Sequence, residues 1–456
     1  MKKLAAALLV ALIGCDSSLD PGAGGSSSAS TGGLGGASSA SESSSASSSS
    51  GTGGAPEDKP CPGWDGWAAW DDWAASYPFC YATDPQAVVE PIEWEPCDPL
   101  SGMSTGCRQM KVTWPYNFSP FAVVASGFEE EDGTVLLSFT RVNSSNEGER
   151  FIMPIVAEAD GPVRAALLDP RSNVSEYAWM GSTMSRGVGA GRALFELTDF
   201  DIEGELPDAL VGFELGVPRP FVEHGFSDGI GHGFGTSSDI WGTWDSNRIL
   251  IARWGEEPIE VWGPAQSGYQ QTRFVPFGEF GTWHDGDEFH ANVMAWTPER
   301  GAYPFIHFGN DETHGAEALG TDGTDLVWIQ SEGRLPDGTY AERSIVTSPF
   351  TTDPDALEPR RLRSYPSSYA GILPFTVGCG YASYSYEPGK VLLIRIEDGA
   401  WWELPSSGCT GPDFTGDYCF ESPYAITCDE LFLKGGFVMN IARVEISSLG
   451  EPNPPD

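Results

Sequence analysis

The six histidines of this 456-residue chain are the side chains with the clearest capacity for catalysis or metal binding. They fall within 91 consecutive residues, at His224, His232, His284, His290, His307 and His314. Imidazole nitrogens bind transition metals, and nearby carboxylates such as Asp285 and Glu312 could complete a ligand set. No pair of histidines has a standard zinc spacing, so ordinary hydrogen-bonded residues of the fold are the alternative. The candidate ligand-binding or metal-binding residues, with no metal specified, are His232, His284, His290, His307 and His314.

Three acidic stretches could instead bind Ca²⁺, which prefers hard oxygen ligands. They are residues 285–288, 322–325 and 353–355. None follows the EF-hand pattern, and the alternative is that their carboxylates are solvated turn residues. A carboxylate pair for glycoside hydrolysis cannot be chosen among 65 acidic residues from sequence alone. The cofactor prediction is therefore limited to Ca²⁺ or a transition metal.

Motifs for a covalent nucleophile or for nucleotide binding are weak. Residues 225–229 match Gly-x-Ser-x-Gly, but a nucleophile elbow needs a strand before the serine and a helix after it. The sequence that follows, Ile-Gly-His-Gly-Phe-Gly, cannot begin a stable helix. The Gly-rich runs 187–191 and 229–235 also lack a following helix and a P-loop lysine. No catalytic residue is assigned, and a binding protein is favoured over an enzyme.

The balance of charges excludes one class of partner. Acidic residues outnumber basic ones by 65 to 25, which gives a formal net charge of −40 at pH 7. Such a surface repels nucleic acid and anionic headgroups, and it attracts divalent cations or cationic partners. Solubility outside the cell is the simpler consequence of the same charge. We expect a monomer that does not bind nucleic acid.

The N-terminus has the features of an export signal. A positively charged start precedes an apolar run, Leu4 to Ile13, that is too short to span a bilayer. The run ends in Leu-Ile-Gly-Cys at residues 12–15, which resembles a bacterial lipobox. The resemblance implies cleavage before Cys15, acylation of its thiol and amine, and stable anchoring by more than one acyl chain. Residues 1–14 would then be a lipoprotein signal peptide, and the protein would be extracytoplasmic, at the periplasmic face of a bacterial membrane or at the cell surface.

A flexible tether would separate this anchor from the folded part. Residues 15–58 consist largely of Ser, Gly, Ala and Thr, which cannot bury enough apolar surface to offset the entropy of ordering. The root-mean-square reach of about 40 such residues is on the order of 35 Å. The folded part is therefore expected to stand clear of the membrane surface.

Eight cysteines follow the tether and cluster at the two ends of the remaining chain. They are Cys61, Cys80, Cys97, Cys107, Cys379, Cys409, Cys419 and Cys428. An even number in an exported chain implies disulfide bonds, although their connectivity is not fixed by sequence. Pairing between sequence neighbours gives the expected set Cys61–Cys80, Cys97–Cys107, Cys379–Cys409 and Cys419–Cys428.

A Trp-rich stretch lies within residues 59–100, between the tether and the main fold. Trp64, Trp67, Trp70, Trp73 and Tyr77 recur every three or four residues. This spacing predicts one face of a short helical segment. That face could pack on the main fold, or it could be an exposed platform that stacks on sugars.

From Ile92 onward the pattern is typical of β structure. Seven strand-like runs each follow a turn signal, at 134–139, 193–197, 248–254, 289–296, 325–329, 390–396 and 430–433. Further apolar runs between them would supply outer strands. Seven units of four short antiparallel strands predict an all-β fold with a single β-propeller over residues 101–456. Seven blades are expected, within a range of six to eight, and a pair of two-sheet β-sandwiches is the main alternative.

A repeat in this region supports stacked units. Gly-Thr pairs begin at Gly242, Gly281 and Gly320, so both intervals are 39 residues. The units resemble those of β-propeller proteins in general, without a WD or kelch signature. Residues 237–244 come near the sialidase-type Asp box, Ser-x-Asp-x-Gly-x-Thr-Trp, but Trp241 occupies the Gly place. Because that box is a structural turn in its family, the similarity supports the fold and no activity.

These patterns lead to one functional hypothesis and one alternative. We expect an exported, lipid-anchored β-propeller that acts as a binding or scaffolding module at the cell envelope, with a protein or glycan as ligand. The alternative is a glycan-active or metal-assisted hydrolase with its site at the axial mouth of the propeller, where the histidines would converge.

Overall fold

The computed structural model describes twenty stretches of the chain. They are residues 65–70, 79–97, 103, 106–111, 126–129, 134–144, 150–168, 183–189, 191–197, 209–225, 233–245, 248–262, 274–285, 292–308, 313–335, 340–366, 375–387, 390–405, 420–435 and 441–455. All belong to one compact unit, Glu57–Asp456. In these stretches the α-helical structure is the four-residue α1 (Pro85–Val88), and no helix has the length and apolar character needed to cross a membrane.

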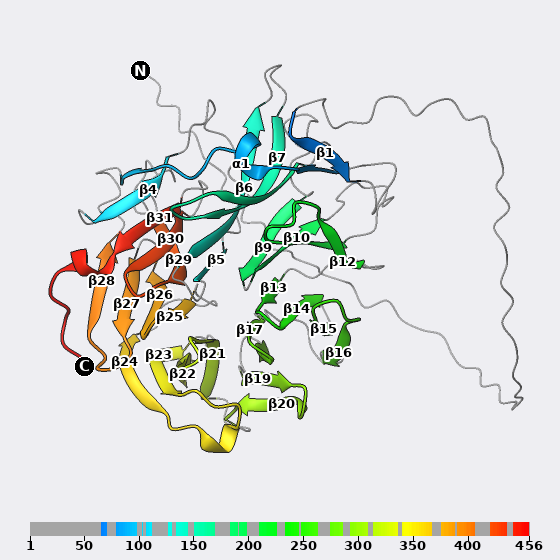
Figure 1. Cartoon of the computed structure of the whole chain (residues 1–456). Coiled ribbons are helices and arrows are strands. Elements are labelled where there is room, and N and C mark those ends of the chain that lie inside the picture. The colour runs from blue at the N-terminus through cyan, green and yellow to red at the C-terminus, as the bar shows by residue number, and fades with distance from the viewer. Residues whose placement is uncertain are drawn as a thin grey trace, which may run out of the picture. The chain divides into compact units, whose positions relative to one another are not determined.

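Seven antiparallel sheets make up the fold, and we number them as blades 1 to 7 in chain order (Figure 1). Blade 1 contains β5 (Ser126–Glu129), β6 (Val135–Ser144), β7 (Arg150–Glu158) and β8 (Val163–Leu168); blade 2 contains β9 (Thr183–Gly189), β10 (Arg192–Leu197), β11 (Ala209–Glu214) and β12 (Phe221–Gly225). Blade 3 contains β13 (Gly233–Thr236), β14 (Ile240–Asp245), β15 (Arg248–Arg253) and β16 (Ile259–Trp262); blade 4 contains β17 (Val275–Phe277), β18 (Phe280–Asp285), β19 (Asn292–Thr297) and β20 (Gly301–Ile306). Blade 5 contains β21 (His314–Thr321), β22 (Asp325–Arg334), β23 (Tyr340–Pro349) and β24 (Arg360–Pro366); blade 6 contains β25 (Phe375–Gly378), β26 (Tyr381–Glu387), β27 (Lys390–Arg395) and β28 (Trp401–Pro405). Blade 7 contains β29 (Phe420–Ile426), β30 (Glu430–Gly435) and β31 (Ile441–Glu445).

The first strands of the blades contact one another around a closed ring. Each of β5, β9, β13, β17, β21, β25 and β29 lies beside the first strand of the next blade, and β29 returns to β5. The predicted seven-bladed β-propeller is therefore confirmed, and the alternative pair of β-sandwiches is wrong.

Apolar side chains fill the interfaces between adjacent blades. Successive residues of a strand point to opposite faces, so in β22 the side chain of Trp328 packs toward blade 4 and that of Val327 toward blade 6. The described core divides into seven clusters, one for each interface, including the interface of blade 7 with blade 1. Closing the ring lets every blade bury both of its faces, which an open stack of blades would not.

The seven strand-like runs predicted from the sequence fall one in each blade. They correspond to β6, β10, β15, β19, β22, β27 and β30. Each is the second or third strand of its blade. Middle strands are covered on both faces by neighbouring blades, so they carry the most continuous apolar sequence and give the clearest signal.

Two of the three Gly-Thr copies occupy equivalent positions. Gly242 and Gly281 lie in the second strands of blades 3 and 4, whereas Gly320 lies in the first strand of blade 5. A Cβ at Gly242 or Gly281 would lie 2.5 or 2.6 Å from an atom of the Phe274 ring, which packs between the two glycines. A Cβ at Gly320 would instead meet Val377 of blade 6. The 39-residue period therefore marks equivalent sites in blades 3 and 4 and does not extend to blade 5.

Residues that precede the first blade close the ring and extend two of its outer edges. β4 (Cys107–Met110) pairs with β31 and becomes the fourth strand of blade 7, and β3 (Trp94–Pro96) pairs with β4. β2 (Phe79–Ala82) pairs with β8 of blade 1, and β1 (Trp67–Trp70) pairs with β2. The last blade thus contains strands from both ends of the chain, so it cannot form fully until both ends are present.

The predicted Trp-rich helix is wrong for the residues that the structure describes. Trp67 and Trp70 lie in strand β1. Trp70 is buried in the cluster between blades 1 and 2, while Trp67 packs against the cluster between blades 7 and 1. Pairing with β2 and these two contacts outweigh a helical spacing, because sequence periodicity expresses only a local preference. The remaining members of the pattern, Trp64, Trp73 and Tyr77, lie outside the described residues.

Candidate functional site

The two ends of the ring differ in construction. Because strands alternate in direction, the connections between first and second strands and between third and fourth strands share one end, which we name the turn end. The connections between second and third strands, and from each fourth strand to the next blade, share the other end, which we name the loop end. First-to-second connections contain two to five residues, whereas the connections from blade to blade contain 7 to 14 residues from blade 1 onward.

Three of the four described histidines lie at the loop end. His284 is the penultimate residue of β18, His307 follows β20, and His314 opens β21. His224, in β12, instead lies beside the turn end of blade 3: its ring centroid is 6.0 Å from that of Trp241, and its Nδ1 is 3.9 Å from a carboxylate oxygen of Glu257 in the third-to-fourth connection. Three of the five candidate ligands therefore belong to blades 4 and 5 or to the connection between them. The other two, His232 and His290, lie outside the described residues.

His314 and His224 have different surroundings. The His314 ring stacks on Phe308 with ring centroids 5.6 Å apart, and its Nδ1 lies 3.0 Å from Thr313 Oγ1. Burial lowers the pKa of His224, and the carboxylate of Glu257, 3.9 Å away, opposes that shift. In the part of the chain that the structure describes, no three His, Cys, Asp or Glu side chains form a metal-ligand group.

Two of the three candidate Ca²⁺ stretches use a carboxylate to hold backbone. Asp322 Oδ1 accepts hydrogen bonds from two N–H groups of its own turn, both at 3.0 Å, and its Oδ2 accepts one from Gly380 at 2.9 Å. Burial, followed by the charge of Asp322, raises the pKa of the neighbouring Asp325. Asp353 caps the short 3-10 helix that follows it. These contacts support the turn interpretation, and the third stretch, 285–288, lies mostly outside the described residues.

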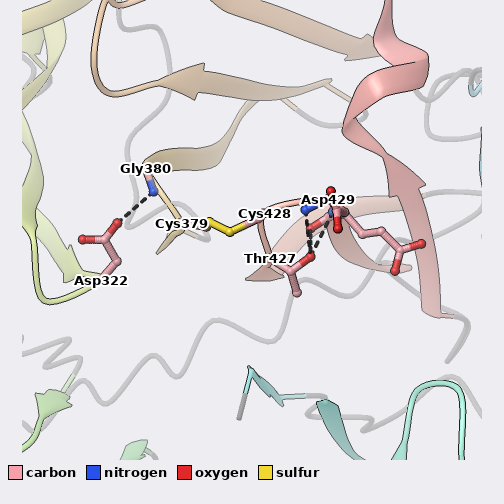
Figure 2. The surroundings of a disulfide bond; sticks show 7 residues. Asp322, Cys379, Gly380, Thr427, Cys428 and Asp429 are labelled. Carbon is pink, nitrogen blue, oxygen red and sulfur yellow. Dashed lines mark hydrogen bonds between the residues drawn. A yellow bond between two sulfur atoms is a disulfide. The ribbon is translucent and has the colours of Figure 1, made fainter. Parts of the chain in front are cut away.

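A series of contacts, which we name the turn belt, links consecutive blades at the turn end. It joins Ser237 to Gly278, Phe277 to Gly323, Asp322 to Gly380, and Cys379 to Cys428, and so runs from blade 3 to blade 7. Ser237 Oγ donates to the Gly278 carbonyl at 2.7 Å. The missing side chain of Gly323 leaves room for the Phe277 ring. Figure 2 shows the last two links, the Asp322 carboxylate on the Gly380 amide and the adjacent disulfide bond.

The disulfide bond between Cys379 and Cys428 corrects the predicted pairing. Cys379–Cys409 and Cys419–Cys428 were the expected bonds, and both are wrong. Cys379 and Cys428 lie in first-to-second turns of blades 6 and 7, and these turns are neighbours in space although 49 residues separate them in sequence. The pairing follows from the blade interface, which sequence proximity does not reflect.

The other described cysteines agree with export from the cytoplasm. The predicted bond between Cys97 and Cys107 is confirmed and lies where β3 and β4 meet. Cys80 is also disulfide-bonded, and its predicted partner, Cys61, lies outside the described residues. Disulfide bonds persist in oxidising compartments, so the chain belongs outside the cytoplasm.

A turn motif that recurs in the belt was missed in the sequence. Ser237, Thr321 and Thr427 each stand at or just after the end of a first strand. The side-chain oxygen of each accepts hydrogen bonds from backbone N–H groups two or three residues ahead, at 3.0 to 3.3 Å. A sequence signal for this turn was available: a Ser or Thr stands two residues before an Asp or Gly. The partial Asp box, with Ser237 and Asp239, is one instance of it.

A buried arginine fixes the junction where the ring closes. Arg443 of β31 is 3% exposed, donates a hydrogen bond to Asp160 of blade 1 at 2.5 Å, and lies 3.5 Å from Glu430. Its guanidinium lies over the Trp94 ring, 4.5 Å from the centroid, and the Trp94 indole donates to the Ala159 carbonyl at 2.6 Å. Burial raises the pKa of Glu430, and the charge of Arg443 opposes that shift. One cation thus couples blade 7, blade 1 and the N-terminal strands.

No protein-family model matches the sequence, and no curated protein matches it. Among solved structures, an oligogalacturonate lyase from Vibrio parahaemolyticus is similar at 10% identity over 78% of this chain and 98% of its own, with a TM-score of 0.46. The β-propeller domain of the Trilobed protease from Pyrococcus furiosus is similar at 8% identity over 72% of this chain and 97% of its own, with a TM-score of 0.40. BamB from Moraxella catarrhalis is similar at 10% identity over 75% of this chain and 90% of its own, with a TM-score of 0.37. Likeness at this level concerns the fold alone and assigns no activity.

Proposed function

We propose that the protein is a lipid-anchored β-propeller that binds a partner at the cell envelope through its loop end. The contrast between the two ends of the ring supports this proposal. Cross-blade contacts join the short first-to-second connections of the turn end, whereas the longer blade-to-blade connections of the loop end leave from strands that the seven apolar interfaces hold in place. Binding residues are typically found on loops that a rigid scaffold positions.

The charge of the loop end favours a cationic partner. The connection between β10 and β11, residues 198–208, contains five acidic residues and no basic one. A protein with a net charge of −40 already attracts cations over long range. Protein segments rich in Lys or Arg, or amino sugars of envelope glycans, fit this field.

The test is capture of envelope proteins and glycans by the purified chain without residues 1–56. Neutralising the five acids of 198–208 should abolish capture, because the attraction and the contacts would be lost. The matched control neutralises Asp239 and Glu279, exposed acids of the turn end, and should leave capture intact. Equal capture by both variants, or equal loss, would place the binding face elsewhere.

The lipid anchor is tested separately. If Cys15 is acylated, cells grown with an alkyne-labelled fatty acid should yield labelled protein in the membrane fraction, and Cys15→Ser should remove the label and release the protein. The tether predicted for residues 15–58 would leave the propeller free to meet partners at a distance from the membrane.

The location of the histidines favours one alternative, a metal-assisted or glycan-active hydrolase at the loop end. His284, His307 and His314 lie on neighbouring blades at that end. The alternative predicts stoichiometric zinc, copper or manganese in the purified protein, and its loss in the His284→Ala and His314→Ala variants. Protein without metal would remove the metal-assisted version.

A further inference from the structure

We propose that the outer edge of blade 6 is a binding site for an extended, proline-rich segment of a partner protein, and that residues 451–455 occupy this site in the structure. The proposal concerns the side of the ring and does not depend on the function of the loop end. It follows from the way in which the segment Glu-Pro-Asn-Pro-Pro lies against β28, the fourth strand of that blade.

Backbone and side chains of β28 both contribute donors and acceptors. Trp401 and Asn453 exchange two backbone hydrogen bonds, at 3.2 and 2.8 Å, as an antiparallel pair. The Trp401 indole N–H donates to the Pro454 carbonyl, and the Trp402 indole N–H donates to the Gly450 carbonyl, both at 3.0 Å. Indole N–H groups that donate to carbonyls of a proline-containing strand are a recurrent feature of proline-rich peptide recognition.

Two further contacts shape the site. The guanidinium of Arg363, from the neighbouring β24 of blade 5, lies 3.7 Å from the centroid of the Trp401 ring, which fixes the orientation of the indole. Gly399 has a positive φ of 75°, and a Cβ there would lie 3.4 Å from Pro455. Blade 5 therefore contributes to the orientation of the aromatic edge through Arg363.

The contacts define which sequences would fit. The residue at the Asn453 position must supply a backbone N–H, so it cannot be proline. The residues at 452, 454 and 455 donate no hydrogen bond among the contacts described, and proline at these positions lowers the entropy lost on binding. The expected motif is Pro-x-Pro-Pro, where x is not proline and asparagine adds a side-chain hydrogen bond to the Trp401 carbonyl, at 3.3 Å.

The segment is held in a way that permits exchange. Glu451, Asn453, Pro454 and Pro455 are exposed, so its attachment rests on hydrogen bonds and little buried apolar surface. A second copy of the chain carries the same segment, but a net charge of −40 on each copy opposes their association. A partner protein with a proline-rich segment is the occupant that this edge favours.

The experiment uses the full chain and a fluorescein-labelled peptide with the sequence of residues 449–456, followed by fluorescence anisotropy. Asn453→Pro removes the N–H that the chain's own segment donates, so this variant should bind the peptide at least tenfold more tightly than the wild type. Adding Trp401→Phe, which keeps the aromatic ring but removes the indole N–H, should weaken binding at least tenfold. The matched control, Trp254→Phe, removes an indole N–H that donates to Ser237 in blade 3 and should change nothing.

Three results would overturn the proposal. The first is that the peptide binds the wild type and the Asn453→Pro variant equally tightly. The second is that a peptide with proline at the Asn453 position binds the variant as tightly as the original peptide. The third is that Trp401→Phe leaves the affinity for the peptide unchanged. Dimerisation of the wild type at micromolar concentration, abolished by Asn453→Pro, would identify a second copy as the occupant and overturn the assignment to a partner. Urea unfolding curves of each variant, compared with that of the wild type, test whether the ring is intact.

Discussion

Replacing Arg443 with Met should destabilise the protein far more than the loss of an ordinary surface ion pair. The side chain lies at the junction of blades 7 and 1, where it meets Asp160, Glu430 and the Trp94 ring. Breaking a buried ion pair by removing one partner costs about 3–5 kcal/mol, and a cation–π contact adds about 0.5–2 kcal/mol. The Asp160 side chain is 67% exposed and can be rehydrated, so most of the ionic cost falls on Glu430, which is 18% exposed. We expect a loss of about 3 kcal/mol in the free energy of unfolding.

The assay is equilibrium unfolding in urea, with Arg253→Met as the matched control. Arg253 pairs with Glu279 at 2.6 Å, but both side chains are more than 40% exposed, so that substitution should cost less than about 1 kcal/mol. Glu430→Gln combined with Arg443→Met should recover part of the loss, because no isolated charge then remains at the junction. Equal effects of Arg443→Met and Arg253→Met, or strict additivity in the double variant, would refute the idea that this cation stabilises ring closure.

Three further predictions concern other parts of the ring. Replacing Cys379 and Cys428 with Ser opens a link across 49 residues and should lower the free energy of unfolding by about 4 kcal/mol under non-reducing conditions; a loss below 1 kcal/mol would contradict this. Gly242→Ala sets a methyl group 2.5 Å from a Phe274 ring atom and should cost about 1–3 kcal/mol in thermal or urea unfolding. In the double variant Gly242→Ala/Phe274→Leu, the loss in the free energy of unfolding should be smaller than the sum of the two single losses, because the aromatic ring that clashes is gone. Additive losses would argue against the clash. Burial raises the pKa of Asp325 above its ordinary value, so stability should fall as pH rises from the ordinary aspartate range through that raised pKa. In a plot of Tm against pH, Asp325→Asn should make the decline of Tm with rising pH less steep. An unchanged decline would exclude the Asp325 carboxyl as its source.

One middle strand of each blade, and the number of blades, could be read from the sequence because the features that specify them are local. An apolar middle strand such as β27 carries Val, Leu, Leu and Ile in one run, and a Pro-Gly turn precedes it. Both features depend on neighbours within a few residues. The signal run and lipobox at residues 1–15 rest on local sequence features of the same kind and remain predictions.

Contacts between blades could not be read in this way. Cys379 meets Cys428, and Arg443 meets Asp160, across 49 and 283 residues of chain. Neither residue of each pair has a local sequence feature that identifies its partner. The partner lies on the adjacent blade, and the tertiary structure alone brings the two residues together. Trp67 and Trp70 show the same limit, since their helical spacing was overridden by pairing with β2.

The sequence by itself determined an acidic, cysteine-stabilised chain of short strands in seven units, because composition and alternation are properties of each stretch taken alone. Only the tertiary structure decided that the N-terminal strands complete the last blade, that Cys379 pairs with Cys428, and that His284, His307 and His314 share one end of the ring. These depend on closure, in which strands far apart in sequence must satisfy their hydrogen bonds and bury their apolar faces against one another.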